Sequence, residues 1–312
     1  MKFNPRAKID RSQVQDRRGQ GGRRGGGMSG LPGLGRGGGT GGIPIPTGGG
    51  IGGIIVVIII VVLGLVFGGN VLGGGSGSDQ SATLNDCIDG SDAVQQDCRI
   101  NIDVNAIQSF WTDYLPQAAG VDYQESDTVY LAGSTSTGCG QATSAMGPFY
   151  CPNDKTVYLD LTFFDDMLQG QLGASGGEFQ EAYVLAHEYG HHIQDLLGTL
   201  GKHQSSATGP TSESVRIELQ ADCYAGVWTH YATTAKDENG EVFITEISDQ
   251  DIKDAINAAT AVGDDRIQQQ TSGRVNPDQW THGSAAERVQ WFQTGYDSGQ
   301  LTSCDTFAPG AL

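Results

Sequence analysis

Basic residues are scarce beyond residue 50 of this chain. The 312 residues contain 18 Lys and Arg and 36 Asp and Glu. Nine of the basic and two of the acidic residues lie in residues 1–50, which leaves nine basic against 34 acidic residues, a net charge of −25. An acidic domain of this kind is soluble and repels nucleic acid. We therefore expect no nucleic-acid partner for the main domain.

Charged residues are missing altogether from Gly37 through Ser78. Within this stretch, 14 of the 17 residues 51–67 are Ile, Val, Leu or Phe. As a helix, residues 51–72 would be about 33 Å long, enough for a hydrocarbon core of about 30 Å. The basic excess precedes the segment, which places the N-terminus in the cytoplasm and the rest outside. The sequence thus predicts a single-pass protein of the cell membrane.

Residues 1–50 lack any helical or strand period and contain 17 glycines mixed with arginine. A segment of this composition cannot bury a core, so we expect a disordered cytoplasmic tail. Residues 73–84, rich in glycine and serine, are expected to form a flexible linker after the membrane helix. Residues 85–312 remain as one extracytoplasmic globular domain.

Histidine is rare as well, with six in the chain, yet two fall in the pentad His187-Glu188-Tyr189-Gly190-His191. The apolar stripe of residues 178–197 predicts a mostly buried helix that ends at Gly198. Residues four apart share one helix face, so the two histidines can bind one metal ion. Glu188 can then reach a water molecule without being a ligand. This is the H-E-x-x-H arrangement of zinc peptidases, with the glutamate as general base.

A catalytic zinc ion takes three protein ligands and keeps one open position. Glu218 and Asp222 lie four apart in a second apolar stretch that also predicts a helix. We expect Glu218 to be the third ligand. Asp222 is expected to accept a hydrogen bond from the outer nitrogen of a ligating histidine. The ligand types favour a single zinc ion, although they also suit iron or manganese.

None of the six cysteines precedes residue 87. An even number of cysteines outside the cytoplasm predicts disulfides. Six cysteines allow fifteen pairings, and sequence alone does not choose among them. We favour two local pairs and one that ties the C-terminus to the second metal-site helix: Cys87–Cys98, Cys139–Cys151 and Cys223–Cys304.

Four further elements have readable patterns. A helix is expected from Asp103 to Pro116, and helices capped by Ser248 and Ser284 are expected near the C-terminus. Residues 147–164 predict a hairpin whose second arm begins at Lys155. That arm either pairs as an edge strand with an extended substrate or serves only the core. The fold class that follows is α+β, a mainly helical domain with a small sheet or hairpin.

Four separate stretches match one family in order: residues 147–160, 186–194, 218–228 and 281–284. With them, residues 85–307 resemble the bacterial putative neutral zinc metallopeptidases, several of which begin with a short tail and one membrane segment. The resemblance implies a zincin-like fold whose third ligand is a glutamate, here Glu218. It also covers His282, which either donates to the oxyanion formed during hydrolysis or is a loop histidine bonded to backbone.

Together these patterns predict a membrane-anchored zinc-dependent metallopeptidase. It would hydrolyse peptide or protein substrates outside the cytoplasm with a zinc-activated water and Glu188 as general base. The alternative is a non-catalytic, metal-stabilised and membrane-tethered protein that serves binding or envelope assembly. Glu188 argues against this alternative, because a structural zinc site has no use for a base.

Overall fold

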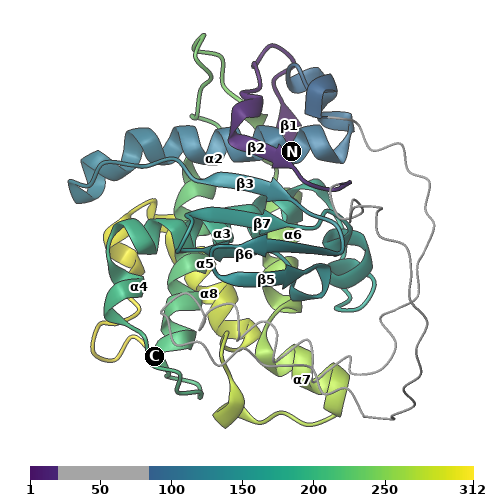
Figure 1. The fold of residues 1–312 in the computed structure, drawn as a ribbon. Coiled ribbons are helices and arrows are strands. Elements are labelled where there is room, and N and C mark those ends of the chain that lie inside the picture. The colour runs from purple at the N-terminus through teal and green to yellow at the C-terminus, as the bar shows by residue number, and fades with distance from the viewer. Residues whose placement is uncertain (20–83) are drawn as a thin grey trace, which may run out of the picture.

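The computed structural model describes residues 1–19 and 84–312, which form a mixed helical and sheet domain (Figure 1). The predicted α+β class is confirmed. The helices are α2 (Gln96–Ala119), α3 (Glu178–Leu196), α4 (Thr199–Lys202), α5 (Glu213–Tyr231), α6 (Asp249–Ala261), α7 (Asp264–Ser272) and α8 (Ala285–Ser298). The strands are β1 (Lys2–Phe3), β2 (Val14–Asp16), β3 (Asp127–Tyr130), β4 (Ser134–Thr137), β5 (Gly140–Thr143), β6 (Phe149–Cys151), β7 (Thr156–Leu159) and β8 (Ile244–Glu246).

The largest sheet has the strand order β2-β3-β7-β6. Strands β2, β3 and β7 run parallel, whereas β6 and β7 form the predicted antiparallel hairpin. Of the two alternatives for the second hairpin arm, the edge strand that pairs with substrate is excluded, because β7 lies between β3 and β6. The end strands of the sheet are β2 and β6, and β6 packs against α3.

The second arm is also shorter than predicted, because β7 ends at Leu159 and not at Phe164. The Asp160 carboxylate accepts hydrogen bonds from the backbone N–H and hydroxyl of Thr162, which turns the chain out of the sheet. A π-helix, η5 (Phe163–Gln169), follows the turn.

Residues 1–19 are folded, so the prediction of a disordered tail is wrong for this part of the chain. Strand β1 pairs antiparallel with β8, and β2 pairs parallel with β3. Ala7 and Ile9, between β1 and β2, and Val14, the first residue of β2, are buried in the main core. All 17 glycines of residues 1–50 lie at or after position 19. The composition averaged over residues 1–50 therefore hid the fact that residues 1–18 contain no glycine.

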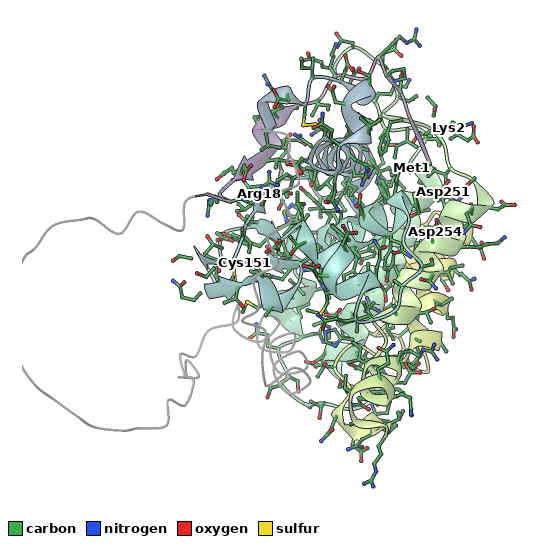
Figure 2. The ribbon with its side chains drawn as sticks, turned by 90° about the vertical axis from the view of Figure 1, so that its right-hand side faces the viewer. Met1, Lys2, Arg18, Cys151, Asp251 and Asp254 are labelled. Atoms are coloured by element: carbon green, nitrogen blue, oxygen red, sulfur yellow. A yellow bond between two sulfur atoms is a disulfide. The ribbon has the colours of Figure 1, made fainter. Side chains whose placement is uncertain are left out.

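This N-terminal segment reaches across the domain (Figure 2). Met1 lies beside Asp251 of α6, and the Arg18 guanidinium lies 2.6 Å from the Asp97 carboxylate of α2. The remaining part of the predicted tail, the predicted membrane helix at residues 51–72 and the linker up to residue 83 lie outside the described residues. Within residues 1–19 and 84–312, no helix is long and apolar enough to cross a membrane.

Helix α2 extends past both predicted ends, and Pro116 lies inside it. Pro116 has no N–H to donate to the Thr112 carbonyl, and one turn later Gly120 ends the helix in the left-handed conformation with its N–H donated to the Pro116 carbonyl. The caps predicted at Ser248 and Ser284 are confirmed, each as a capping box that opens α6 or α8.

The three favoured disulfides, Cys87–Cys98, Cys139–Cys151 and Cys223–Cys304, are confirmed. The last joins residues 81 apart in sequence and fixes the C-terminal segment to α5. In the chain-entropy account, the longest loop restricts the unfolded chain most, so this bond has the largest effect on stability of the three.

Asp103 of α2 is fully buried, and neither of its carboxylate oxygens has a hydrogen-bond partner among the described residues. Burial, with a further effect of the Glu181 carboxylate, raises the pKa of this carboxyl well above its ordinary value despite the nearby Arg99. Aspartate in an unfolded chain has a pKa near 3.9. Between that value and the raised pKa, the folded protein binds one more proton than the unfolded chain, so stability falls as the pH rises.

We therefore expect Asp103→Asn, which keeps the shape of the protonated acid, to raise the melting temperature more at pH 8 than at pH 5. The gain in stability grows by up to about 1.4 kcal/mol per pH unit in this window. Thermal unfolding at the two pH values measures it, with Asp113→Asn at an exposed position of the same helix as the control. An equal gain at both pH values would contradict the explanation.

Candidate metal centre

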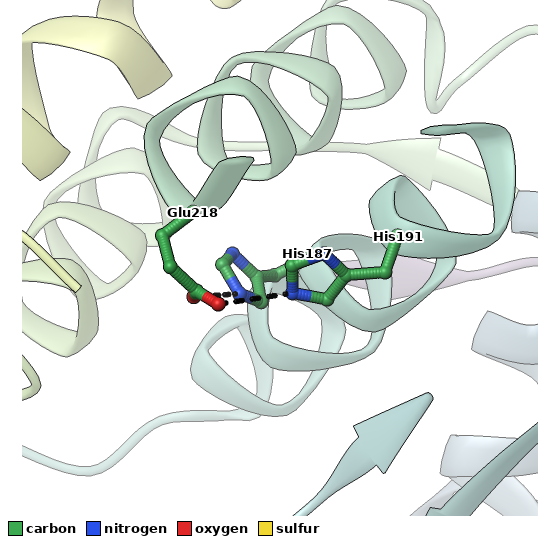
Figure 3. A group of neighbouring side chains, drawn as sticks. All are labelled: His187, His191 and Glu218. Carbon is green, nitrogen blue, oxygen red and sulfur yellow. Dashed lines mark hydrogen bonds and ion pairs between the residues drawn. The ribbon is translucent and has the colours of Figure 1, made fainter. Parts of the chain in front are cut away.

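Three predicted ligand residues converge where α3 and α5 pack side by side (Figure 3). Nε2 of His187 lies 3.2 Å from one oxygen of the Glu218 carboxylate, and Nε2 of His191 lies 3.6 Å from the other. One potential ligand atom from each residue lies within 4.8 Å of the others. All three side chains are buried, so the helices hold them in place.

Two glycine contacts bring the helices of the site together. A Cβ at Gly190, within the pentad, would lie 2.9 Å from the carbonyl oxygen of Ala221, so glycine allows α3 to approach α5. On the other side of α5, a Cβ at Gly226 or Gly295 would overlap the backbone of the facing helix, so α5 and α8 are equally close. The pairing of α3 with α5 sets Glu218 opposite the histidines.

The donor set fits a zinc ion. Zinc in proteins binds nitrogen and oxygen ligands at about 2.0–2.2 Å in tetrahedral geometry, which separates neighbouring ligand atoms by about 3.3–3.6 Å. The distance of 3.2 Å between Nε2 of His187 and its nearer Glu218 oxygen is close to this separation. Nε2 of His191 lies nearest the other Glu218 oxygen, and one ligand atom from each of the three residues lies within 4.8 Å of the others, so the group is close enough together to bind one ion. Burial lowers the pKa of His187, but the Asp222 and Glu218 carboxylates outweigh burial and raise it to about 10. The site thus favours positive charge, which a divalent ion would supply in place of the proton.

Asp222 lies where the sequence predicts it, with one carboxylate oxygen 2.8 Å from Nδ1 of His187. Two partners of Asp222 were not predicted. The Arg288 guanidinium of α8 donates to both carboxylate oxygens, at 2.7 and 2.9 Å, and the Tyr183 hydroxyl donates at 2.5 Å. Burial raises the pKa of Asp222, but Arg288 and His187 outweigh it and lower the value to about 2. Asp222 therefore stays ionised and orients His187.

His191 is oriented by a second unpredicted residue. The Gln194 side-chain carbonyl lies 2.9 Å from Nδ1 of His191, three residues earlier on the same helix. The Gln194 amide in turn donates to the Ile217 carbonyl of α5 at 2.7 Å. Both ligating histidines therefore have Nδ1 engaged and Nε2 directed at Glu218. The spacing of three between His191 and Gln194 was a signal in the sequence, since such residues meet on a helix surface.

Glu188 borders the same cavity as the three ligand residues and is not a member of their group. Burial raises the pKa of its carboxyl, and the adjacent histidines oppose this effect. A general base works best when its pKa lies near the working pH, so the raised value suits proton transfer.

His282 also borders this cavity, and Asp264 holds it there. One oxygen of Asp264 accepts the backbone N–H groups of Thr281, His282 and Gly283, and the other lies 3.2 Å from Nδ1 of His282. Burial lowers the pKa of His282, but the Asp264 carboxylate outweighs it and raises the value. With Nδ1 donating to Asp264, Nε2 can donate to a group in the cavity when the ring is protonated on both nitrogens, the form that the raised pKa favours. Asp264, at the start of the unpredicted helix α7, was missed.

Comparison with known proteins gives one family and several relatives. The sequence profile described as "Putative neutral zinc metallopeptidase" matches residues 1–307. An uncharacterized protein of Mycobacterium tuberculosis (strain H37Rv) is 51% identical over 231 residues, 73% of this chain and 77% of that protein. The uncharacterized protein YpfJ of Escherichia coli K12 is 41% identical over 266 residues, 83% of this chain and 87% of YpfJ. No solved structure gives a significant match.

Proposed function

Since this chain belongs to the putative neutral zinc metallopeptidase family, we propose that it is a membrane-anchored, zinc-dependent enzyme that hydrolyses peptide bonds. The observation that carries the proposal is the convergence of His187, His191 and Glu218 from two buried helices, with Glu188 beside them on the same cavity. A site that served only to stabilise the fold would need no base next to an open cavity.

Each residue of the site has its own role in the proposed reaction. His187, His191 and Glu218 would hold the zinc ion, which when bound acts as a Lewis acid and lowers the pKa of water from about 15.7 toward 7. Glu188 takes the proton of the attacking water and transfers it to the leaving amine. His282 donates from Nε2 to the negative oxygen that develops on the scissile carbonyl. Asp222, Arg288 and Gln194 keep the ligating rings in the required orientation.

We place the catalytic domain outside the cytoplasm, with peptides or proteins of that compartment as substrates. The three disulfides support this placement, because such bonds form and persist in oxidising compartments. The proposed membrane anchor, residues 51–72, rests on its apolar composition. Because β2 pairs with β3, the chain before and after this segment lies on the same side of the bilayer, so we propose that the segment inserts into the membrane without carrying the chain across it.

Zinc content and hydrolysis, measured on the same preparation, test the proposal. The full chain, purified in detergent under oxidising conditions, is expected to contain one zinc ion per molecule and to cleave casein. Treatment with o-phenanthroline should remove both zinc and activity, whereas its non-chelating isomer m-phenanthroline should remove neither. Added zinc should restore cleavage. A zinc-containing, folded protein that cleaves no casein and no peptide mixture would refute the proposal and favour the non-catalytic alternative.

The role of His282 gives a separate prediction. We expect His282→Ala to lower kcat by about 100- to 1000-fold, the effect of removing one oxyanion donor, with KM and zinc content little changed. Steady-state kinetics and elemental analysis measure these quantities. His230→Ala is the matched control, because His230 is an exposed histidine of α5. An unchanged kcat for His282→Ala would mean that this residue is a loop histidine without a catalytic role.

A further inference from the structure

The cavity beside the metal centre has two unlike walls and a volume of about 110 Å³. One wall carries the ligand residues together with Glu188, His282 and Arg288. The other wall is made of apolar side chains from several elements: Phe163, Met167, Leu172, Val184, Val262 and Ile267. Reaction at the polar wall does not require this apolar wall, so its presence calls for another explanation.

The apolar wall begins next to the metal centre. Val184 lies three residues before His187 on α3, so the two side chains are neighbours on one helix face. Phe163 and Met167 come from the π-helix η5, a rare form found often at functional sites. Leu172, Val184 and Ile267 are buried, whereas Phe163 and Met167 are only partly buried. The part of the apolar lining that comes from η5 is therefore partly accessible to solvent.

Charged groups are confined to the polar wall. Among the residues that line the cavity, the charged or ionisable ones are the ligand residues, Glu188, His282 and Arg288, with the Tyr183 phenol. Arg288 is already paired with both oxygens of Asp222. A charged side chain placed against the apolar wall would lose its hydration and find no partner, which is costly.

The inference rests on the proposed function. Given peptide hydrolysis at this site, the geometry of the cavity points to a class of substrate. We infer that the enzyme selects peptides with leucine, methionine or phenylalanine at one of the two residues that flank the scissile bond, and that this side chain occupies the apolar part of the cavity. The apolar side chains named above, with no charged partner among them, suit an uncharged apolar side chain of the substrate.

The expected preference is large enough to measure. A difference of one or more methylenes in an apolar pocket changes kcat/KM by about 10- to 200-fold. We therefore expect peptides with leucine at the selective position to be cleaved at least about tenfold faster than matched peptides with glycine or aspartate there. Substrate residues further from the scissile bond should affect kcat/KM less.

A digest of a mixed peptide library by the zinc-loaded full chain, read by mass spectrometry, tests the inference. Enrichment of leucine, methionine and phenylalanine at either flanking position supports it and identifies the position. Cleavage without such enrichment would overturn this inference and leave the proposed function intact. If no peptide is cleaved although zinc is bound, the proposed function itself fails.

A charge placed in the pocket provides a matched test. In Met167→Lys, the ratio of kcat/KM for leucine over aspartate peptides should fall at least about tenfold. Asp166→Lys adds the same side chain at an exposed position of η5 outside the cavity and should leave the ratio unchanged. Equal ratios in the two variants would contradict the assignment of the pocket.

Binding without turnover separates recognition from catalysis. With the zinc-loaded Glu188→Gln variant, calorimetric titration should give at least tenfold tighter binding of the leucine peptide than of the aspartate peptide. Met167→Lys, added to this variant, should abolish the difference, and circular dichroism checks that the double variant is folded. Equal affinities for the two peptides in the folded Glu188→Gln variant would overturn the inference.

Discussion

Glu188→Gln is expected to bind zinc as the native protein does and to lose peptide hydrolysis. Glutamine has nearly the same shape as glutamate but cannot take a proton from water. Because Glu188 borders the cavity without belonging to the ligand group, its replacement should leave the metal-binding atoms in place. General-base catalysis contributes about 100- to 10,000-fold, so kcat should fall by a factor in this range.

Elemental analysis and casein hydrolysis of the same preparation measure both parts of this prediction. Glu178→Gln is the control, since Glu178 is an exposed glutamate at the start of the same helix. Hydrolysis by Glu188→Gln at the native rate would refute the assignment of the base. Loss of zinc from this variant would show instead that Glu188 is needed to form the metal centre.

Removal of residues 1–19 is expected to unfold the domain. The deletion would take Ile9 and Val14 from the core, each worth about 1.5–3 kcal/mol of burial. It would also expose the edge of β3 and leave the buried Asp97 carboxylate without its partner Arg18. The sum is comparable to the whole stability of a typical domain, about 5–15 kcal/mol.

Two point variants provide a milder form of this test. Val14→Lys puts a charge into the core and should lower the melting temperature strongly. Gln15→Lys puts the same side chain at an exposed position of β2, within reach of the Asp127 carboxylate to which the Gln15 amide donates, and should change the melting temperature little. Thermal unfolding and yield of soluble protein measure the deletion and both variants. A truncated chain as stable as the full one would show that the N-terminal strands contribute nothing to the fold.

The part of the site that the sequence predicted depends on local geometry. His187, Glu188 and His191 are related by helical spacing, and so are Glu218 and Asp222, so their relative placement follows from helix formation alone. Arg288 and Asp264 have no such relation to the pentad. Arg288 reaches Asp222 only because α5 and α8 pack closely at Gly226 and Gly295. Contacts of this kind depend on tertiary packing, and no sequence motif predicts them.

The errors in the fold have a similar origin. Strands of two or three residues, such as β1 and β2, are too short to have a readable period. All four residues of β7 are buried, although their alternation had indicated a half-buried strand, because Val157 and Leu159 pack in the main core and Tyr158 packs in a second cluster. Cysteine pairing was predicted correctly because two of the pairs are close in sequence and the third then had only one arrangement.

The participation of β2 in the main sheet restricts how the chain can be arranged about a bilayer. Residues 14–16 exchange backbone hydrogen bonds with β3, so no hydrocarbon layer of about 30 Å can separate them from the domain. Residue 19 and residue 84, which flank residues 20–83, therefore lie in the same compartment. An arrangement with the first strands inside the cell and the peptidase domain outside is incompatible with this sheet, whatever the charges near the apolar segment favour.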